Sequence, residues 1–362
     1  MKTGRTLKDL MAEVLRQQET KRDFVADTRS VTMTSGLHLQ FGDQDVGVND
    51  VAHGQIADHT KIPQKYYDRM RAEAPDLLAT NVDRWFAKYP APRMVRTLDG
   101  WARAFLSDRY RPLDNSDLLE AALPPLLDMG VEVMSCEVTD RRLYLKVVDQ
   151  RIRKDLPVGW SPGNRGHQQF DTLSPALVLS NSEVGEGALA CQTSVWTGGC
   201  SNLMVVRERS ARKYHVGGKH ELGEDVYRML SDTTKKLTDA ALWAQIADVV
   251  RGAFDQAQFD ATCERLAAAT GDRIDGDPVR VVEVTAKKFG MTDGERGSVL
   301  RHLIAGADLS RYGLHAAVTR AAEDLGDYDR ASQFEQLGGA IIELPKNEWR
   351  EISRAAALAE AA

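Results

Sequence analysis

The spacing of apolar residues changes near residue 220, and this change limits the fold of the chain more than any other feature. Before it, short segments rich in β-branched residues alternate with turn signals, which is typical of antiparallel hairpins. After it, apolar residues recur at helical spacing in 224–269, 278–288, 293–304, 313–325 and 330–343. The sequence therefore predicts an α+β protein, with an antiparallel, hairpin-rich sheet, packed helices and a helical C-terminal region.

Turn residues locate two hairpins. Asp99 and Gly100 separate strand-like segments 93–98 and 100–107, and Asp140 begins the turn between 131–138 and 143–148. Further strands are expected within 31–41, 174–182, 188–197 and 202–206. Helices are expected at 6–25, three times within 51–89, and at 115–129. Segment 155–172 is rich in Gly and Pro without periodicity, so we expect a mobile loop that interrupts the sheet.

Two interpretations fit residues 55–70. The segment resembles a helix-turn-helix, in which Gln64, Lys65 and Tyr67 would face a DNA major groove. Lys61 stands where the turn glycine of that motif usually occurs. The same apolar spacing also fits an αα-corner that packs core residues Ile56, Ile62, Tyr66 and Met70.

Length and charge divide the chain into two parts. A chain of 362 residues exceeds the usual size of a single core. We expect an α+β core at 1–220, with a basic middle segment at 141–220, and an acidic helical domain at 221–362. The net charge is −6, yet residues 141–220 carry twelve Lys and Arg against six Asp and Glu. A chain that is acidic overall can therefore still bind a polyanion locally.

The N-terminal residues alternate charged and apolar types and have no long apolar run, which predicts a cytoplasmic protein without a membrane partner. Four separated cysteines without a CxxC pair indicate reduced thiols. The chain contains no Walker A, GxSxG, HExxH or GxGxxG motif in a suitable context. We expect a non-catalytic protein without a cofactor.

Three groups of residues have side chains that can bind metal ions, and each has a simpler explanation. Cys191, Cys200, His215 and His220 have a zinc-like composition, but their spacing does not fit a zinc knuckle, and small apolar cysteines on strands with histidines on a hydrated loop explain them better. His53, Asp58 and His59 fit ordinary helix positions. Asp108, Asp114 and Asp117 fit turns and helix caps, with Asp114 and Asn115 as the capping residues. We expect no metal site.

The basic middle segment combines cations with an aromatic ring, as single-strand binding grooves do. The candidate nucleic-acid-binding residues are Arg141, Arg142, Lys146, Arg151, Arg153, Lys154, Trp160, Arg165, Arg207, Arg209, Arg212 and Lys213. In this hypothesis the cations neutralise phosphates and Trp160 stacks on bases. The alternative is an ordinary hydrated surface around a loop.

Five stretches carry a resemblance to a known family: 62–67, 104–115, 179–185, 317–319 and 327–331. They are similar to an uncharacterised family, known only as a domain of unknown function, that occurs in phage genomes, plasmids and prophages. The resemblance implies a mobile-element context. At the level of element order, the chain is also similar to strand-annealing recombination proteins, which form rings or filaments without ATP and hold single strands in a basic groove.

Three functions follow as hypotheses. The first is non-catalytic binding of single-stranded DNA, with strand annealing by a homo-oligomer as its more specific form. The second is a protein-interaction factor of a mobile element, directed at a host defence or at replication, that uses its acidic helices to bind a host protein. The third is duplex binding through the helix-turn-helix.

Overall fold

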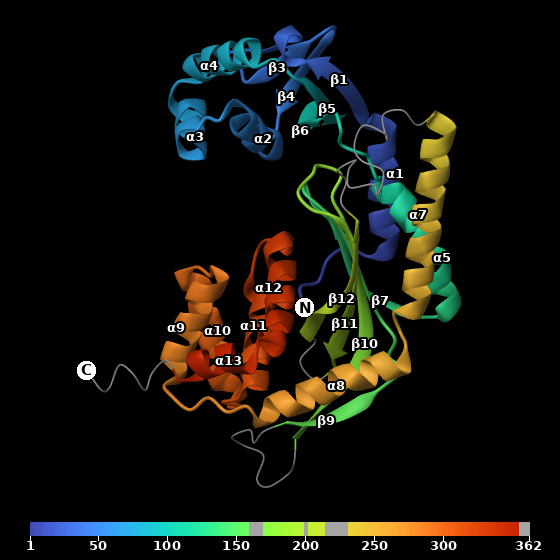
Figure 1. Cartoon of the computed structure of the whole chain (residues 1–362), viewed down its shortest axis with the longest axis vertical. Helices are drawn as coiled ribbons and strands as arrows, with labels where there is room; N and C mark the ends of the chain where they lie inside the picture. The colour runs from blue at the N-terminus through green and yellow to red at the C-terminus, as the bar shows by residue number, and fades with distance from the viewer. Residues whose placement is uncertain (159–168, 199–201, 214–230, 355–362) are drawn as a thin grey trace, which may run out of the picture.

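The computed structural model describes residues 1–158, 169–198, 202–213 and 231–354. It contains two six-stranded sheets followed by a group of C-terminal helices, so the predicted α+β class and helical C-terminal region are confirmed. In Figure 1 the chain forms a crescent, with the first sheet at the top, the second in the middle and the C-terminal helices at the lower left.

The first sheet, here called the N-terminal sheet, has the strand order β1-β5-β6-β4-β3-β2. Its strands are β1 (Arg22–Asp27), β2 (Val31–Met33), β3 (His38–Phe41), β4 (Gln44–Val48), β5 (Pro92–Leu98) and β6 (Trp101–Ser107). Neighbouring strands are antiparallel except β4 and β6. The predicted turn between β5 and β6 forms with positive φ at Asp99 (53°) and Gly100 (79°), as a two-residue hairpin loop requires.

Three helices pack on the N-terminal sheet: α2 (Asp50–Thr60), α3 (Gln64–Glu73) and α4 (Pro75–Lys88). The Asn49 side chain accepts the Ala52 amide and caps α2, and Lys61 ends that helix in the left-handed conformation. Tyr67, Phe86 and other apolar side chains from these helices bury themselves against the strands in one core. A short 3-10 helix (Thr28–Ser30) joins β1 to β2.

The second sheet, here called the central sheet, is antiparallel, with the order β12-β11-β10-β8-β7 and with β9 paired to β10. Its strands are β7 (Glu132–Val138), β8 (Leu143–Val148), β9 (Lys154–Val158), β10 (Gln169–Asn181), β11 (Leu189–Thr197) and β12 (Asn202–Lys213). One face packs on α1 (Leu7–Thr20), α5 (Asn115–Met129) and α7 (Asp232–Gly252). Because α7 shares this core, the core takes residues from both sides of the predicted boundary at 220.

The other face of the central sheet contacts the C-terminal helices (Figure 1). These are α8 (Gln256–Gly271), α9 (Pro278–Phe289), α10 (Asp293–Gly306), α11 (Arg311–Ala321), α12 (Tyr328–Glu343) and α13 (Lys346–Ser353), with a 3-10 helix (Ala322–Asp324) before α12. Helices α9–α13 have an apolar core of their own, which includes Val299, Leu314, Phe334 and Trp349.

The structure corrects several details of the sequence prediction. The helix predicted at 6–25 ends at Thr20, and β1 begins at Arg22. β9 and the start of β10 occupy both ends of the predicted loop 155–172, and its residues 159–168 lie outside the described chain. Pro157 is tolerated because β9 pairs with only one neighbour, β10. β12 continues to Lys213, well beyond 206. The predicted helix at 224–269 is two helices, since the Asp255 side chain caps α8, and α13 was not predicted.

A buried network of charges, here called the junction, joins the two sheets. Arg96 on β5 has no exposed surface, and its guanidinium contacts Asp23 (2.8 Å), Asp114 (3.0 Å) and the Glu183 carbonyl (2.8 Å). Arg103 on β6 binds the Glu183 carboxylate at 2.6 Å. Burial opposes the positive charge of Arg96, but Asp23, Asp114 and Glu183 outweigh it and raise its pKa above the ordinary value.

We predict that Arg96→Met destabilises the protein by about 3–5 kcal/mol, because it removes the cation that pairs with Asp23, one of the two cations that pair with Asp114, and the donor of the buried Glu183 carbonyl. Urea unfolding measures the change. The matched control is Arg29→Met, which removes an exposed arginine that pairs with Asp27. We expect the control to leave the unfolding midpoint nearly unchanged. Equal midpoints for the two variants would show that the junction does not hold the sheets together.

We also predict that stability falls as pH decreases from about 6.5 to about 4. Burial lowers the pKa of His53 and of His315 to about 4. The unfolded chain binds these protons near pH 6.5, so acid favours the unfolded state, and each histidine contributes up to roughly 3 kcal/mol over this range. His53→Gln should flatten the pH dependence of the urea midpoint. The exposed-histidine control His38→Gln should not change it.

Candidate nucleic-acid interface

The predicted basic segment does not form one continuous surface. Arg141 and Arg142 lie in the turn between β7 and β8, while Arg151 and Arg153 follow the other end of β8. A strand rises about 3.3 Å per residue, so the two pairs are separated by the whole length of β8.

Lys146 is fully buried and cannot contact a phosphate in this arrangement. Its ammonium donates to both carboxylate oxygens of Glu335 on α12, at 2.7 and 2.9 Å, and lies 4.6 Å from the centre of the Tyr328 ring. This corrects the sequence prediction, which took Lys146 for a phosphate contact. The side chains of β8 alternate between faces, and both faces of the strand are covered by helices, so position 146 turns inward.

Most other cations of the segment have partners within the protein. Arg142 donates to the Glu186 carbonyl, and Arg151 forms two hydrogen bonds with the Asp149 carboxylate. Lys154 pairs with Asp260 of α8 at 2.8 Å. Arg153 donates to a backbone carbonyl. Arg141 is exposed, and no acid within the described ranges lies at ion-pair distance from its side chain.

Six predicted residues cannot be placed with their side chains. Trp160 and Arg165 lie outside the described chain. The backbones of the β12 residues Arg207, Arg209, Arg212 and Lys213 are placed, whereas their side chains belong to the undescribed part. Their contribution to a nucleic-acid surface stays a prediction.

The helix-turn-helix prediction is wrong for one of its three contact residues. Tyr67 has no exposed surface, and its hydroxyl forms a 2.8 Å hydrogen bond with the His53 ring. The αα-corner interpretation is correct for Ile56, Ile62 and Met70, which are buried, but Tyr66 is 49% exposed. The core position predicted for Tyr66 is therefore wrong, and the adjacent Tyr67 occupies the core instead.

The candidate metal ligands that the structure describes do not converge. No group of three or more His, Cys, Asp or Glu side chains is arranged to hold a metal ion among the residues that the structure places. Cys191 is buried on β11, where burial raises the pKa of its thiol to about 12. Cys200, His215 and His220 lie outside the described residues. Asp114 is at the N-cap of α5, although its carboxylate binds Lys21 and Arg96 instead of the helix amides.

Two of the stretches that carry the family resemblance meet at the junction. From 104–115, Tyr110 donates to the Ser182 carbonyl (2.9 Å), and the Asn115 amide donates to the Glu183 carboxylate (2.7 Å). Asn181 donates to the Leu113 carbonyl and to the Asn115 side chain. These residues are buried and bind one another, so the most distinctive sequence of the chain builds an internal contact.

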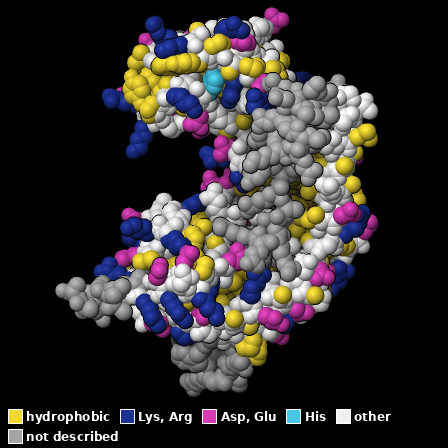
Figure 2. Space-filling model, viewed as in Figure 1, with side chains coloured by type: hydrophobic (Ala, Val, Ile, Leu, Met, Phe, Trp, Pro, Cys, Tyr) yellow, Lys and Arg dark blue, Asp and Glu magenta, His cyan; other side chains and the backbone are white. Residues whose placement is uncertain are grey.

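Sequence analysis missed an exposed aromatic and basic surface on α4. This surface, here called the α4 platform, consists of Arg84, Trp85, Lys88 and Tyr89. The Trp85 and Tyr89 rings stack with 5.7 Å between centres and 4° between planes; Tyr89 is 60% exposed, and Trp85 is partly buried against the core of the N-terminal sheet. The Lys88 ammonium lies 5.1 Å from the Trp85 ring and 5.4 Å from the Tyr89 ring. In Figure 2 hydrophobic and basic side chains gather over α4 at the top of the view.

The charge of the α4 platform is not neutralised locally. Arg84 and Lys88 are exposed, and neither forms an ion pair with an acid from the described ranges. The neighbouring acid Asp83 instead accepts the Met33 amide at 2.7 Å. A sequence signal could have identified the platform. Trp85 and Tyr89 are four residues apart in a predicted helix, and a cation, Arg84 or Lys88, precedes each ring.

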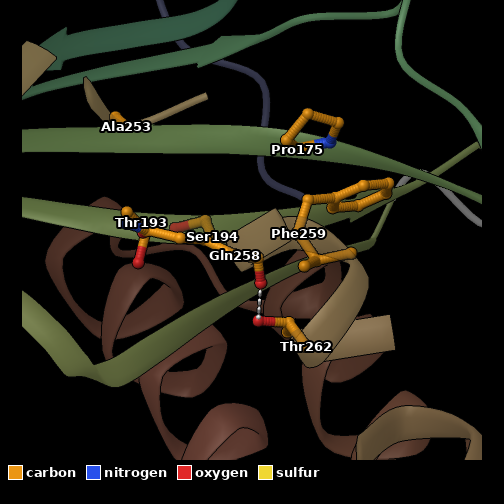
Figure 3. Close-up of a pocket in the computed structure, with 8 residues that line it drawn as sticks. Pro175, Thr193, Ser194, Ala253, Gln258, Phe259 and Thr262 are labelled. Carbon is orange, nitrogen blue, oxygen red and sulfur yellow. Dashed lines mark hydrogen bonds between the residues drawn. The ribbon is translucent and has the colours of Figure 1, made fainter. Parts of the chain in front are cut away.

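A cavity between β10, β11 and α8 is too small for a metabolite. Pro175, Ser194, Phe259 and Thr262 are among the residues that line it (Figure 3). Its volume is about 20 Å³, enough for one water molecule. This cavity therefore offers no site for a metabolite.

None of the described helices combines the length and apolar composition of a membrane span. Compared with family models, curated proteins and solved structures, the chain matches none of them. The resemblance to a mobile-element family therefore stays a prediction from the residues alone.

Proposed function

We propose that this protein binds single-stranded DNA without catalysing a reaction, and that the α4 platform is a contact surface for it. The observation that carries the proposal is the stacked pair of Trp85 and Tyr89 with Lys88 beside both rings. Exposed aromatic rings with adjacent cations supply the two interactions that a flexible nucleic-acid strand needs, base stacking and phosphate neutralisation.

The geometry of the platform favours a single strand over a duplex. A base can stack on an exposed ring only if its own face is free, and bases within a duplex already stack on each other. Recognition of a duplex by α3 would need Tyr67 in the major groove, but Tyr67 is buried and hydrogen-bonded to His53. The platform also suits a nucleic-acid strand better than a protein surface. Its two cations can contact phosphates, and its rings can stack on bases, which a protein surface does not offer.

Exposed cations outside the platform can extend the bound strand. Arg141, Arg151 and Arg153 have exposed side chains and stay in the proposal as phosphate contacts, whereas Lys146 does not in the arrangement described. The more specific role, strand annealing by a homo-oligomer in a mobile element, is proposed on the family resemblance and on the order of elements.

We predict that Trp85→Ala and Tyr89→Ala each weaken binding of a labelled oligothymidylate by about 1–3 kcal/mol, roughly fivefold to more than a hundredfold in affinity. Fluorescence anisotropy at several salt concentrations measures this. Lys88→Glu should weaken binding and also flatten its salt dependence, since fewer counterions are released.

The matched control is Trp101→Ala, which removes a tryptophan that is 54% exposed at the other end of the β5–β6 hairpin. Binding by this control should equal that of the unmodified protein. A duplex competitor should displace the oligothymidylate poorly. If the platform variants and the Trp101 control bind alike, the platform is not the contact surface.

We further predict that joint charge reversal, Arg151→Glu with Arg153→Glu, weakens oligothymidylate binding. The slope of log affinity against log salt concentration should fall by the amount that about two phosphate contacts contribute. Arg251→Glu with Arg280→Glu, two exposed arginines that each pair with an acid of their own helix, is the control, because it changes the net charge by the same amount. Equal salt dependence in both proteins would remove the predicted basic segment from the interface.

A further inference from the structure

The two faces of the central sheet differ in chemistry. Toward α1, α5 and α7 the described side chains of the sheet are mainly apolar, among them Leu145, Val147, Leu177 and Leu179, each without exposed surface. Toward α12 a row of cross-strand neighbours reads Ser135, Lys146, Val178 and Gln192. Neighbours in such a row point to the same face, so a polar band crosses the sheet under α12.

Acidic side chains of α12 cover this polar band. Glu335 binds Lys146, and Asp329 accepts hydrogen bonds from the Tyr144 hydroxyl (2.8 Å) and the Thr139 hydroxyl (2.9 Å). Tyr328 adds a 2.7 Å hydrogen bond to Ser135. Two carboxylates on one helix therefore hold a lysine and two hydroxyls of the sheet, which are the groups that bind phosphates elsewhere.

Some polar groups between the covered sheet face and α12 lack hydrogen-bond partners. Among the buried atoms of the described residues, Gln192 Nε2 on β11 and Ser332 Oγ on α12 have no hydrogen-bond partner. A buried polar atom without a hydrogen bond destabilises the closed arrangement, and a ligand that forms this hydrogen bond would remove that cost. Polar interfaces of this kind are typical of parts that separate, whereas permanent cores are apolar.

An apolar cluster attaches the C-terminal helices to the sheet at the far end. There, Leu173, Val195, Phe259 and Tyr312 share an apolar cluster that links β10, β11, α8 and α11. At the near end, beside the β7–β8 turn, the described contacts of α12 with the sheet are hydrogen bonds, an ion pair and the packing of the Tyr328 ring on Tyr144. Since α9–α13 also have their own core, they can move as a unit about the apolar end.

We propose that α9–α13 form a hinged acidic cap, and that the sheet face it covers is a second binding surface for the phosphodiester chain of single-stranded DNA. The carboxylates of Asp329 and Glu335 occupy the places that phosphates take when the cap opens. This inference rests on the proposed function for its ligand, but the existence of the cap does not depend on it.

The test uses the full-length protein and two measurements. Glu335→Gln removes the carboxylate that neutralises Lys146, so the cap should open, amide hydrogen exchange in β8 and α12 should increase, and a labelled oligothymidylate should bind about tenfold more tightly. Asp329→Asn should act in the same direction. Glu351→Gln on α13 removes an equal charge from an exposed position and should change neither measurement.

A second variant covers the case in which Glu335→Gln does not fold. Lys146→Met with Glu335→Leu replaces the buried ion pair by apolar side chains of similar size, which stabilises many proteins. The cap should then stay closed, with slower exchange in β8 and weaker oligothymidylate binding.

The outcomes separate the two proposals. Unchanged exchange in β8 for Glu335→Gln, relative to Glu351→Gln, overturns the cap whether or not DNA binds. Faster exchange without any gain in oligothymidylate affinity keeps the movement but overturns the second binding surface. Absence of oligothymidylate binding by every variant, the unmodified protein included, refutes the proposed function itself.

Discussion

The buried guanidinium of Arg96 is the interaction on which the arrangement of the two sheets depends. It gathers Asp23 from β1, Asp114 from the start of α5 and the Glu183 carbonyl from the turn after β10. A planar donor with five N–H groups in a fixed fork can satisfy three partners that lie around the plane of the guanidinium. Because each partner belongs to a different element, the charge fixes the N-terminal sheet against the central sheet.

The junction also explains why the most distinctive sequence of the chain carries no binding site. The residues from 104–115 and 179–185 have the types expected of a reactive centre: acids, arginines, a tyrosine and amides. In the structure each of the key groups has an internal partner, and Tyr110, Asn115 and Glu183 are buried. Charged residues with internal partners of this kind determine how the elements pack against one another. Ligand recognition then depends on other residues, at the surface.

Recognition in the proposed function therefore rests on groups that the fold leaves without partners. On α4, the exposed Tyr89 ring stacks on the partly buried Trp85 ring, and the nearby cations remain without ion pairs among the placed residues. The polar face of the central sheet shows the opposite state, with Lys146 neutralised by Glu335. One surface is ready for a polyanion, and the other is occupied by an internal acid.

The sequence by itself determined the local elements, because turns, caps and periodicity act within a few residues. It located α5 at 115–129 and the β5–β6 turn at Asp99 and Gly100, and it predicted a helical C-terminal region. Only the tertiary structure decided which cations are free. Arg141 and Lys146 are both basic residues of one hairpin, but Lys146 meets an acid 189 residues away while Arg141 stays exposed. Long-range pairing of this kind leaves no local pattern, and for that reason the accessible binding residues required the fold.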